Sequence, residues 1–169
     1  MNEISGYWAF SCNPERWEID TDLNNKIEYD TLTIRNSDKD KIHAGHMGVI
    51  RVGNDNRTKK YLNEKQRLLP GVYAIVEVIT EPELMEEPIL EYWQSKGNTV
   101  QKRFRVKVKI SRNLITCPIL ITQEDFWDSN DDSLLIKGFQ GSTFPISSYS
   151  FDKIYSYSKQ ADFFLIMNY

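Results

Sequence analysis

The chain has 169 residues and a mass of 19.8 kDa, which suits one domain spanning residues 1–169. Hydrophobic residues make up 40% and charged residues 27%, as in ordinary globular proteins, which argues against wholesale disorder. The formal net charge of −3 argues against a protein that coats nucleic acid non-specifically, because such a protein needs a broad basic surface.

The N-terminal half of the chain is expected to contain short strands separated by polar turns. Apolar and β-branched residues predict strands at 7–10, 31–34 and 47–52. The Asn-Pro pair at 13–14 suits the start of a helix, because asparagine can cap it and proline fits its first turn. A short helix is therefore expected over 16–19.

The C-terminal half contains the most apolar strand, expected over 72–79 and at the centre of a sheet. The acidic segment 83–93 is expected to be partly helical. Another element begins at 118–121, and the glycine-rich loop 138–146 leads to a closing helix at 151–157. These elements predict an α+β domain built on a curved β-sheet or small β-barrel flanked by short helices.

Basic residues gather in two segments, with five of the 21 lysines and arginines in 57–67 and six in 102–112. Within the strand predicted at 103–110, apolar and basic residues alternate, and a period of two puts the basic ones on one face. Such a face can follow a phosphate backbone. The alternative is a solvated outer face balanced by neighbouring acids. The residues expected to contact phosphates are Lys59, Lys60, Arg103, Arg105, Lys107 and Lys109.

Large aromatic side chains stand next to loops as well as within strands. Trp17, Trp93, Trp127 and Phe139 all lie beside polar or glycine-rich segments. Rings at the ends of loops can stack on a flat ligand such as a nucleobase. The alternative for any single ring is a small hydrophobic cluster beneath a loop.

The sequence offers little for catalysis, metal binding or cofactor binding. His43 and His46 have a spacing that suits a metal site on a helix, but Gly45 and the strand after it break the helix. No P-loop, nucleophile elbow or dinucleotide fingerprint is present. We therefore expect a binding protein rather than an enzyme, with no metal and no cofactor.

The cysteine content, the N-terminal segment and the apolar runs indicate the cellular compartment of the protein. Cys12 and Cys117 are too few for a disulfide framework. The N-terminus lacks the basic and apolar regions of a secretory signal, and no apolar run approaches the roughly 20 residues of a transmembrane helix. These features predict a cytoplasmic protein with no membrane partner.

Several segments, taken in order, carry a resemblance to a known family. They are YWAF at 7–10, NPERW at 13–17, IHAGH at 42–46, PGVYAIVEV at 70–78 with the Glu-Pro pair at 81–82, the strand at 104–110 and GFQGSTFPI at 138–146. Over about residues 6–157 the chain resembles an EVE domain, a member of the PUA-like superfamily related to YTH domains. The closing part is similar to EVE domains joined to HNH nucleases in modification-dependent restriction.

The resemblance implies a PUA-like β-barrel flanked by helices, with an aromatic pocket that accepts a flipped, modified base. Many family members have a tryptophan before the segment that matches 34–36, where this chain offers Tyr29 or Leu32. Segment 57–67 looks like an insertion. Carried over to this sequence, the implied pocket residues are Ser11, Cys12, Asn13, Trp17, Tyr29, Leu32, Arg35, Asn36, Trp93, Gln140, Ser142 and Thr143.

EVE domains are associated with modified cytosine in DNA and YTH domains with N6-methyladenine in RNA. We therefore expect a non-enzymatic reader of 5-methyl- or 5-hydroxymethylcytosine, with DNA favoured over RNA. The alternatives are a YTH-like reader of modified RNA, and a module of a defence system that binds a protein or a small ligand. Any cleavage would require a nuclease or another effector protein as a partner.

Overall fold

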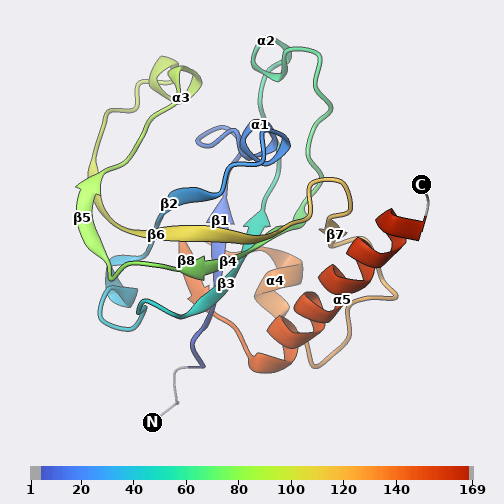
Figure 1. Cartoon of the computed structure of the whole chain (residues 1–169). Coiled ribbons are helices and arrows are strands. Elements are labelled where there is room, and N and C mark those ends of the chain that lie inside the picture. Colours follow the sequence, from blue (N-terminus) through green and yellow to red (C-terminus); the bar gives the residue numbers. More distant parts are fainter. Residues whose placement is uncertain (1–4, 168–169) are drawn as a thin grey trace.

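A mixed β-sheet of eight strands forms the centre of the molecule (Figure 1). The computed structural model describes residues 5–167, apart from the side chains at 92 and 163–165, so the ends of the predicted 1–169 domain lie outside the described residues. The strands are β1 Tyr7–Cys12, β2 Tyr29–Thr33, β3 Met47–Val52, β4 Gly71–Val78, β5 Glu83–Glu86, β6 Lys102–Asn113, β7 Ile119–Leu120 and β8 Thr143–Pro145. The helices are α1 Ile19–Asn24, α2 Lys59–Leu62, α3 Glu91–Ser95, α4 Ser133–Lys137 and α5 Ser148–Met167, with a 3-10 turn at Asn36–Asp38.

The strand order is β2-β6-β4-β3-β1-β8, with β5 added on β6 and β7 on β4. The pair β1–β3 is parallel, and the other pairs are antiparallel. The register shifts at Ile50/Arg51 between β3 and β4, and at Ile75/Val76 between β4 and β6. Such irregularities bend a strand and increase its twist, so the sheet curls into a half-barrel.

The inner strands are buried on both faces, which explains their nearly continuous apolar sequences. In β1, Trp8 and Phe10 belong to one hydrophobic cluster and Ala9 to the other, as a period of two requires. The first cluster includes Ile19 and Leu23 of α1, whereas the second lies beneath α4 and α5. Figure 1 shows α5 along the side of the sheet away from α1.

Most of the expected strands are confirmed, including 47–52, which is β3 without change. The helix expected over 16–19 is wrong: residues 14–16 form a turn, and the first helix is α1. The physical reason is that the Asn13 side chain accepts the backbone N–H of Glu15 at 3.0 Å, which closes a local turn instead of capping a helix.

Two expectations for the second half need correction. Within 83–93, only residues 91–93, the start of α3, are helical as expected. Residues 83–86 instead form strand β5, which pairs with β6. The closing helix α5 runs well beyond 151–157 to Met167. None of the helices described between residues 5 and 167 combines the length and the apolar character that crossing a membrane demands.

Gly71 marks the closest approach of β4 to β7. A Cβ added there would overlap the carbonyl oxygen of Ile119 and lie 2.9 Å from the Cα of Leu120. Because both contacts are backbone, we expect Gly71→Ala to lower the free energy of unfolding by about 1–3 kcal/mol, measured by urea denaturation. Gly53→Ala is the control, since its nearest backbone contact would be 3.9 Å away. Equal stability of the two variants would contradict this packing.

Candidate binding site

A cavity of about 430 Å³, here called the first cavity, opens between the end of β1, strand β2 and the beginning of β6. Segments 87–90 and 141–142 complete its rim. The lining residues come from these elements and from the loop that joins β1 to α1: Ser11, Cys12, Asn13, Arg16, Trp17, Asp22, Asp30, Thr31, Leu32, Thr33, Glu87, Pro88, Leu90, Arg103, Arg105, Gly141 and Ser142. The volume lies within the range of small-molecule sites.

Two carboxylates of the first cavity each keep one oxygen available. Asp22 accepts the indole N–H of Trp17 at 2.6 Å through Oδ2, and Asp30 accepts the backbone N–H of Thr31 at 2.7 Å through Oδ1. The other oxygen of each has no hydrogen bond within the described part of the chain. Burial raises the pKa of Asp30, and the nearby charge of Asp22 raises it further.

Arg105 forms part of the floor of the first cavity and is only 6% exposed. Its Nη atoms donate to the hydroxyls of Thr31 and Thr33 and to the carbonyl oxygen of Thr31. Its Nε is buried without a hydrogen-bond partner among the described residues. Burial lowers the pKa of this guanidinium, which carries its charge without a carboxylate in ion-pair contact among residues 5–167.

Glu87 balances the two other arginines of the first cavity. Its Oε1 lies 2.6 Å from Nη2 of Arg16, and its Oε2 lies 3.0 Å from Nε of Arg103. The Arg16 guanidinium also lies over the ring of Trp93, 5.3 Å from its centroid. These contacts hold the rim segment 87–90 against the loop after β1.

Not all of the basic residues predicted on one face of β6 are exposed. The alternation of sides is present, but Arg105 is buried by β2 and Arg103 is paired with Glu87. Lys107 is exposed and lies 4.8 Å from the ring centroid of Tyr29, while Lys109 is 4.0 Å from Glu28. Lys59 and Lys60 begin α2, away from the lining of the first cavity.

The structure brings together six of the predicted pocket residues in the first cavity: Ser11, Cys12, Asn13, Trp17, Leu32 and Ser142. Arg35 and Thr143 instead bind the buried Asp38, and Asn36 begins the 3-10 turn. Tyr29 is exposed. The ring of Trp93 packs against the Arg16 guanidinium and is not among the residues that line the cavity. Gln140 lines a neighbouring cavity.

Sequence reasoning missed the charged residues Arg16, Asp22, Asp30 and Glu87. Each stands in a polar or acidic stretch that reads as solvent-exposed. A signal was present for Asp30, since it directly precedes the β-branched run 31–34 and alternation assigns its side chain to one face of that strand.

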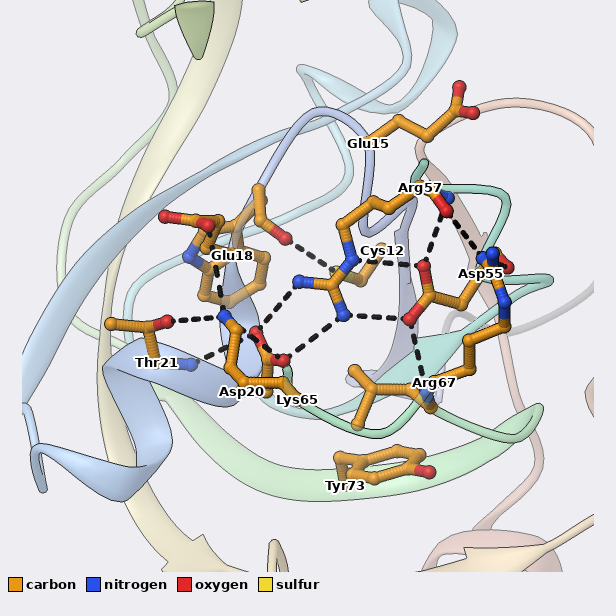
Figure 2. Close-up of polar contacts among 12 residues, drawn as sticks. Cys12, Glu15, Glu18, Asp20, Thr21, Asp55, Arg57, Lys65, Arg67 and Tyr73 are labelled. Carbon is orange, nitrogen blue, oxygen red and sulfur yellow. Dashed lines mark hydrogen bonds and ion pairs between the residues drawn. The ribbon is translucent and has the colours of Figure 1, made fainter. Parts of the chain in front are cut away.

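A buried ion cluster joins α1 to the basic segment 57–67 (Figure 2). Arg57, 1% exposed, donates to both oxygens of Asp20 at 3.1 and 3.0 Å and to both oxygens of Asp55 at 2.9 and 2.7 Å. Lys65 adds a hydrogen bond to Thr21 at 2.9 Å. The basic segment 57–67 is therefore tied to α1, and α1 follows the loop that supplies much of the cavity wall.

The charges of this cluster are strongly coupled. Burial is the largest single influence and would raise the pKa of Asp20 and of Asp55, but the hydrogen bonds and the positive charge of Arg57, together with smaller contacts, outweigh burial and lower both pKa values. Burial would lower the pKa of Arg57, but the hydrogen bonds and the negative charges of Asp55 and Asp20 together outweigh burial and raise the pKa of its guanidinium.

Both histidines contact other side chains, and Cys12 is buried. His46 Nδ1 accepts the indole N–H of Trp8 at 3.1 Å, and His43 Nδ1 lies 2.9 Å from Glu81. Burial raises the pKa of the Cys12 thiol well above its ordinary value, which disfavours the reactive thiolate. Among the residues that the structure describes, no group of His, Cys, Asp and Glu could hold a metal ion.

Comparison with known proteins places the fold. No protein-family model matches the sequence, and no curated protein sequence matches it. A hypothetical protein from Leishmania major superposes with a TM-score of 0.55 over 92% of this chain and 96% of its own, at 18% identity. Human THYN1, solved in complex with DNA containing 5-methylcytosine, has a TM-score of 0.54 over 90% and 96%, at 14% identity. A Pseudomonas putida protein has 0.52 over 89% and 97%, at 15% identity.

At these identities the likeness shows the fold alone. The curled mixed sheet with short helices α1–α4 and the longer α5 confirms the expected α+β, PUA-like fold, shared with THYN1-like structures. The comparisons support an EVE-like fold without placing the chain in a particular family.

The ion cluster predicts how stability depends on pH. The folded-state pKa of Asp55 is lowered, so its contribution is present above the unfolded pKa near 3.9 and is lost as pH falls through the folded value. We expect Asp55→Asn to lower the free energy of unfolding at pH 7 by about 3 kcal/mol, the lower end for a broken buried pair because Asp20 still binds Arg57. The loss should shrink as pH falls below about 4.

Asp125→Asn is the matched control, since Asp125 is exposed. Denaturant titrations of both variants between pH 2 and 7 measure the difference. A penalty for Asp55→Asn that stays constant across this range would contradict the coupling.

Proposed function

We propose that the chain is a non-enzymatic reader that binds DNA by accepting a flipped, modified cytosine in the first cavity. The observation that carries this proposal is the pair of carboxylates, Asp22 and Asp30, each with an unused oxygen in a cavity that also offers apolar, neutral polar and cationic groups. The sequence resemblance to EVE domains supports it, as does the similar fold of human THYN1.

The polar groups of the cavity complement the edge of cytosine. Cytosine presents an N4 amino donor, which a carboxylate can accept, and acceptors at N3 and O2, which an arginine N–H can satisfy. Thymine presents an O4 acceptor in place of the amino group, and a carboxylate repels it. The unused oxygen of Asp30 and the unpartnered Nε of Arg105 are the groups proposed for this recognition.

The modification itself would meet apolar surface. Leu32, Pro88 and Leu90 line the cavity, and Trp17 offers a ring on which a base can stack. A methyl group placed against such a surface is worth about 1 kcal/mol, which matches the modest discrimination that one methyl group allows.

Binding rather than catalysis is proposed because Cys12, the cysteine that lines the first cavity, is buried and has a raised pKa, which disfavours a nucleophilic thiolate. Cleavage of the bound DNA would then be the work of a partner nuclease or another effector. We place this activity in the cytoplasm.

The role of Asp30 is tested by fluorescence-polarisation binding of Asp30→Asn to DNA probes that carry 5-methylcytosine, cytosine or thymine at one position. An asparagine amide can donate to O4 of thymine, so discrimination between 5-methylcytosine and thymine should fall by about 1–3 kcal/mol, roughly 5- to 150-fold. Asp125→Asn is the control, being an exposed carboxylate outside the cavity. Unchanged discrimination would remove Asp30 from the site, and equal binding of all probes by the unaltered protein would refute the reader.

The role of Trp17 is tested by comparing Trp17→Ala with Trp17→Phe. Base stacking on an aromatic ring is worth about 1–3 kcal/mol, so the alanine variant should lose at least fivefold in affinity for the 5-methylcytosine probe, and the phenylalanine variant should keep most of it. Probes of the same sequence in RNA, with N6-methyladenine or 5-methylcytosine, separate the DNA reader from the YTH-like alternative. Equal affinities of the two variants would count against stacking.

A further inference from the structure

A second cavity, of about 660 Å³, adjoins the first one. Ser11 lines both cavities, and the segment after α4 continues from one to the other: Gly138 and Gln140 line the second cavity, whereas Gly141 and Ser142 line the first. A ligand that occupies the first cavity and extends past Ser11 therefore reaches the second.

The charge of the second cavity differs from that of the first. Its lining includes Arg51 and Lys137 and contains no aspartate or glutamate. The first cavity, in contrast, balances three arginines with three acids. Lys137 is exposed and makes no ion pair with the described residues. The second cavity therefore carries net positive charge that the protein leaves uncompensated at this point.

Arg51 is the less ordinary of the two cations, because it is only 5% exposed and yet lies in ion-pair contact with no carboxylate of residues 5–167. Its Nε, Nη1 and Nη2 donate to the carbonyl oxygens of Leu135, Val52 and Ile136 at 3.0, 3.1 and 3.1 Å. A guanidinium has five N–H groups, so each Nη keeps one further donor. Burial lowers the pKa of Arg51, the expected effect of removing an unpaired charge from water.

Two glycines leave space beside this guanidinium. Gly138 has φ +84°, and a Cβ at this position would lie 3.6 Å from both Nη atoms of Arg51. A Cβ at Gly53 would lie 4.0 Å from Nη1. A side chain at either position would pack against the guanidinium, and the two glycines leave that space open.

We propose that the second cavity binds the backbone phosphate of the strand next to the flipped nucleotide, with Arg51 and Lys137 as the cationic groups. The inference rests on the proposed function, since the flipped base in the first cavity is what brings the strand across Ser11. It places the phosphate contacts at Arg51 of β3 and at Lys137, the last residue of α4, instead of on β6 and α2. The side chains of Asn54 and Gln140 supply further polar contacts.

The test measures how binding depends on salt. Each phosphate contact that is lost makes the slope of log K against log salt shallower by about 0.7 for single strands and 0.9 for duplexes. We expect this change for Lys137→Gln with the 5-methylcytosine probe, and no change in the ratio of affinities for 5-methylcytosine and cytosine. Lys159→Gln on α5 is the matched control, an exposed lysine outside both cavities, and should keep the original slope.

A probe with an abasic position separates this inference from the proposed function. It keeps the phosphates and lacks the base, so its residual binding at low salt should still weaken in Lys137→Gln. If the unaltered protein binds modified and unmodified probes equally but Lys137→Gln changes the slope, base reading fails and the phosphate site stands. If Lys137→Gln keeps the original slope, or if Lys107→Gln on β6 changes it instead, the phosphate site is overturned.

Arg51→Lys provides a second variant for the buried cation. It keeps the positive charge and loses the planar pair of Nη donors. Circular dichroism first establishes that the variant folds. A folded Arg51→Lys protein should bind the abasic probe at least threefold more weakly at low salt, and unchanged binding would exclude Arg51 from the contact.

Discussion

The position of the first cavity's wall depends on one buried interaction, the sharing of Arg57 between Asp20 and Asp55. A charge this deep is tolerated only when its partners satisfy it, and here both carboxylates hydrogen-bond to it. The cluster joins α1 to segment 55–68, which are distant in sequence. The loop before α1 carries Trp17, so this ion cluster also positions the indole ring of Trp17 in the lining of the cavity.

The three most buried arginines have different partners, and only one of them is neutralised by carboxylates. Arg57 is neutralised by two carboxylates and needs nothing more. Arg51 has three backbone carbonyl oxygens, and Arg105 has threonine oxygens together with one carbonyl. Carbonyl and hydroxyl dipoles reduce the cost of burying a cation but do not cancel its charge. The two arginines without a carboxylate are the two that line cavities.

The sequence predicted the sheet well because strand signals are local. Apolar and β-branched residues predicted β3, and alternation predicted the faces of residues 103–110 in β6. Alternation assigns a side chain to one face of a strand but does not predict whether that face is buried. The burial of Arg105 beneath Thr31 and Thr33 could therefore not be predicted. The placement of Asp22, Asp30 and Glu87 in the cavity was missed for the same reason, because the sequence does not distinguish an acidic residue that lines a cavity from one on the open surface.

The division of charge between the two cavities matches the division of charge within a nucleotide. A cytosine base is neutral and is distinguished by the direction of its hydrogen bonds, so a cavity with balanced charges and fixed donors and acceptors suits it. A phosphate carries a full negative charge and is recognised by cationic groups. The first cavity has three arginines with three acids, whereas both charged residues of the second, Arg51 and Lys137, are cations. Because Ser11 borders both, a single nucleotide and its neighbouring phosphate would satisfy the two cavities together, which neither a free base nor a free phosphate can do.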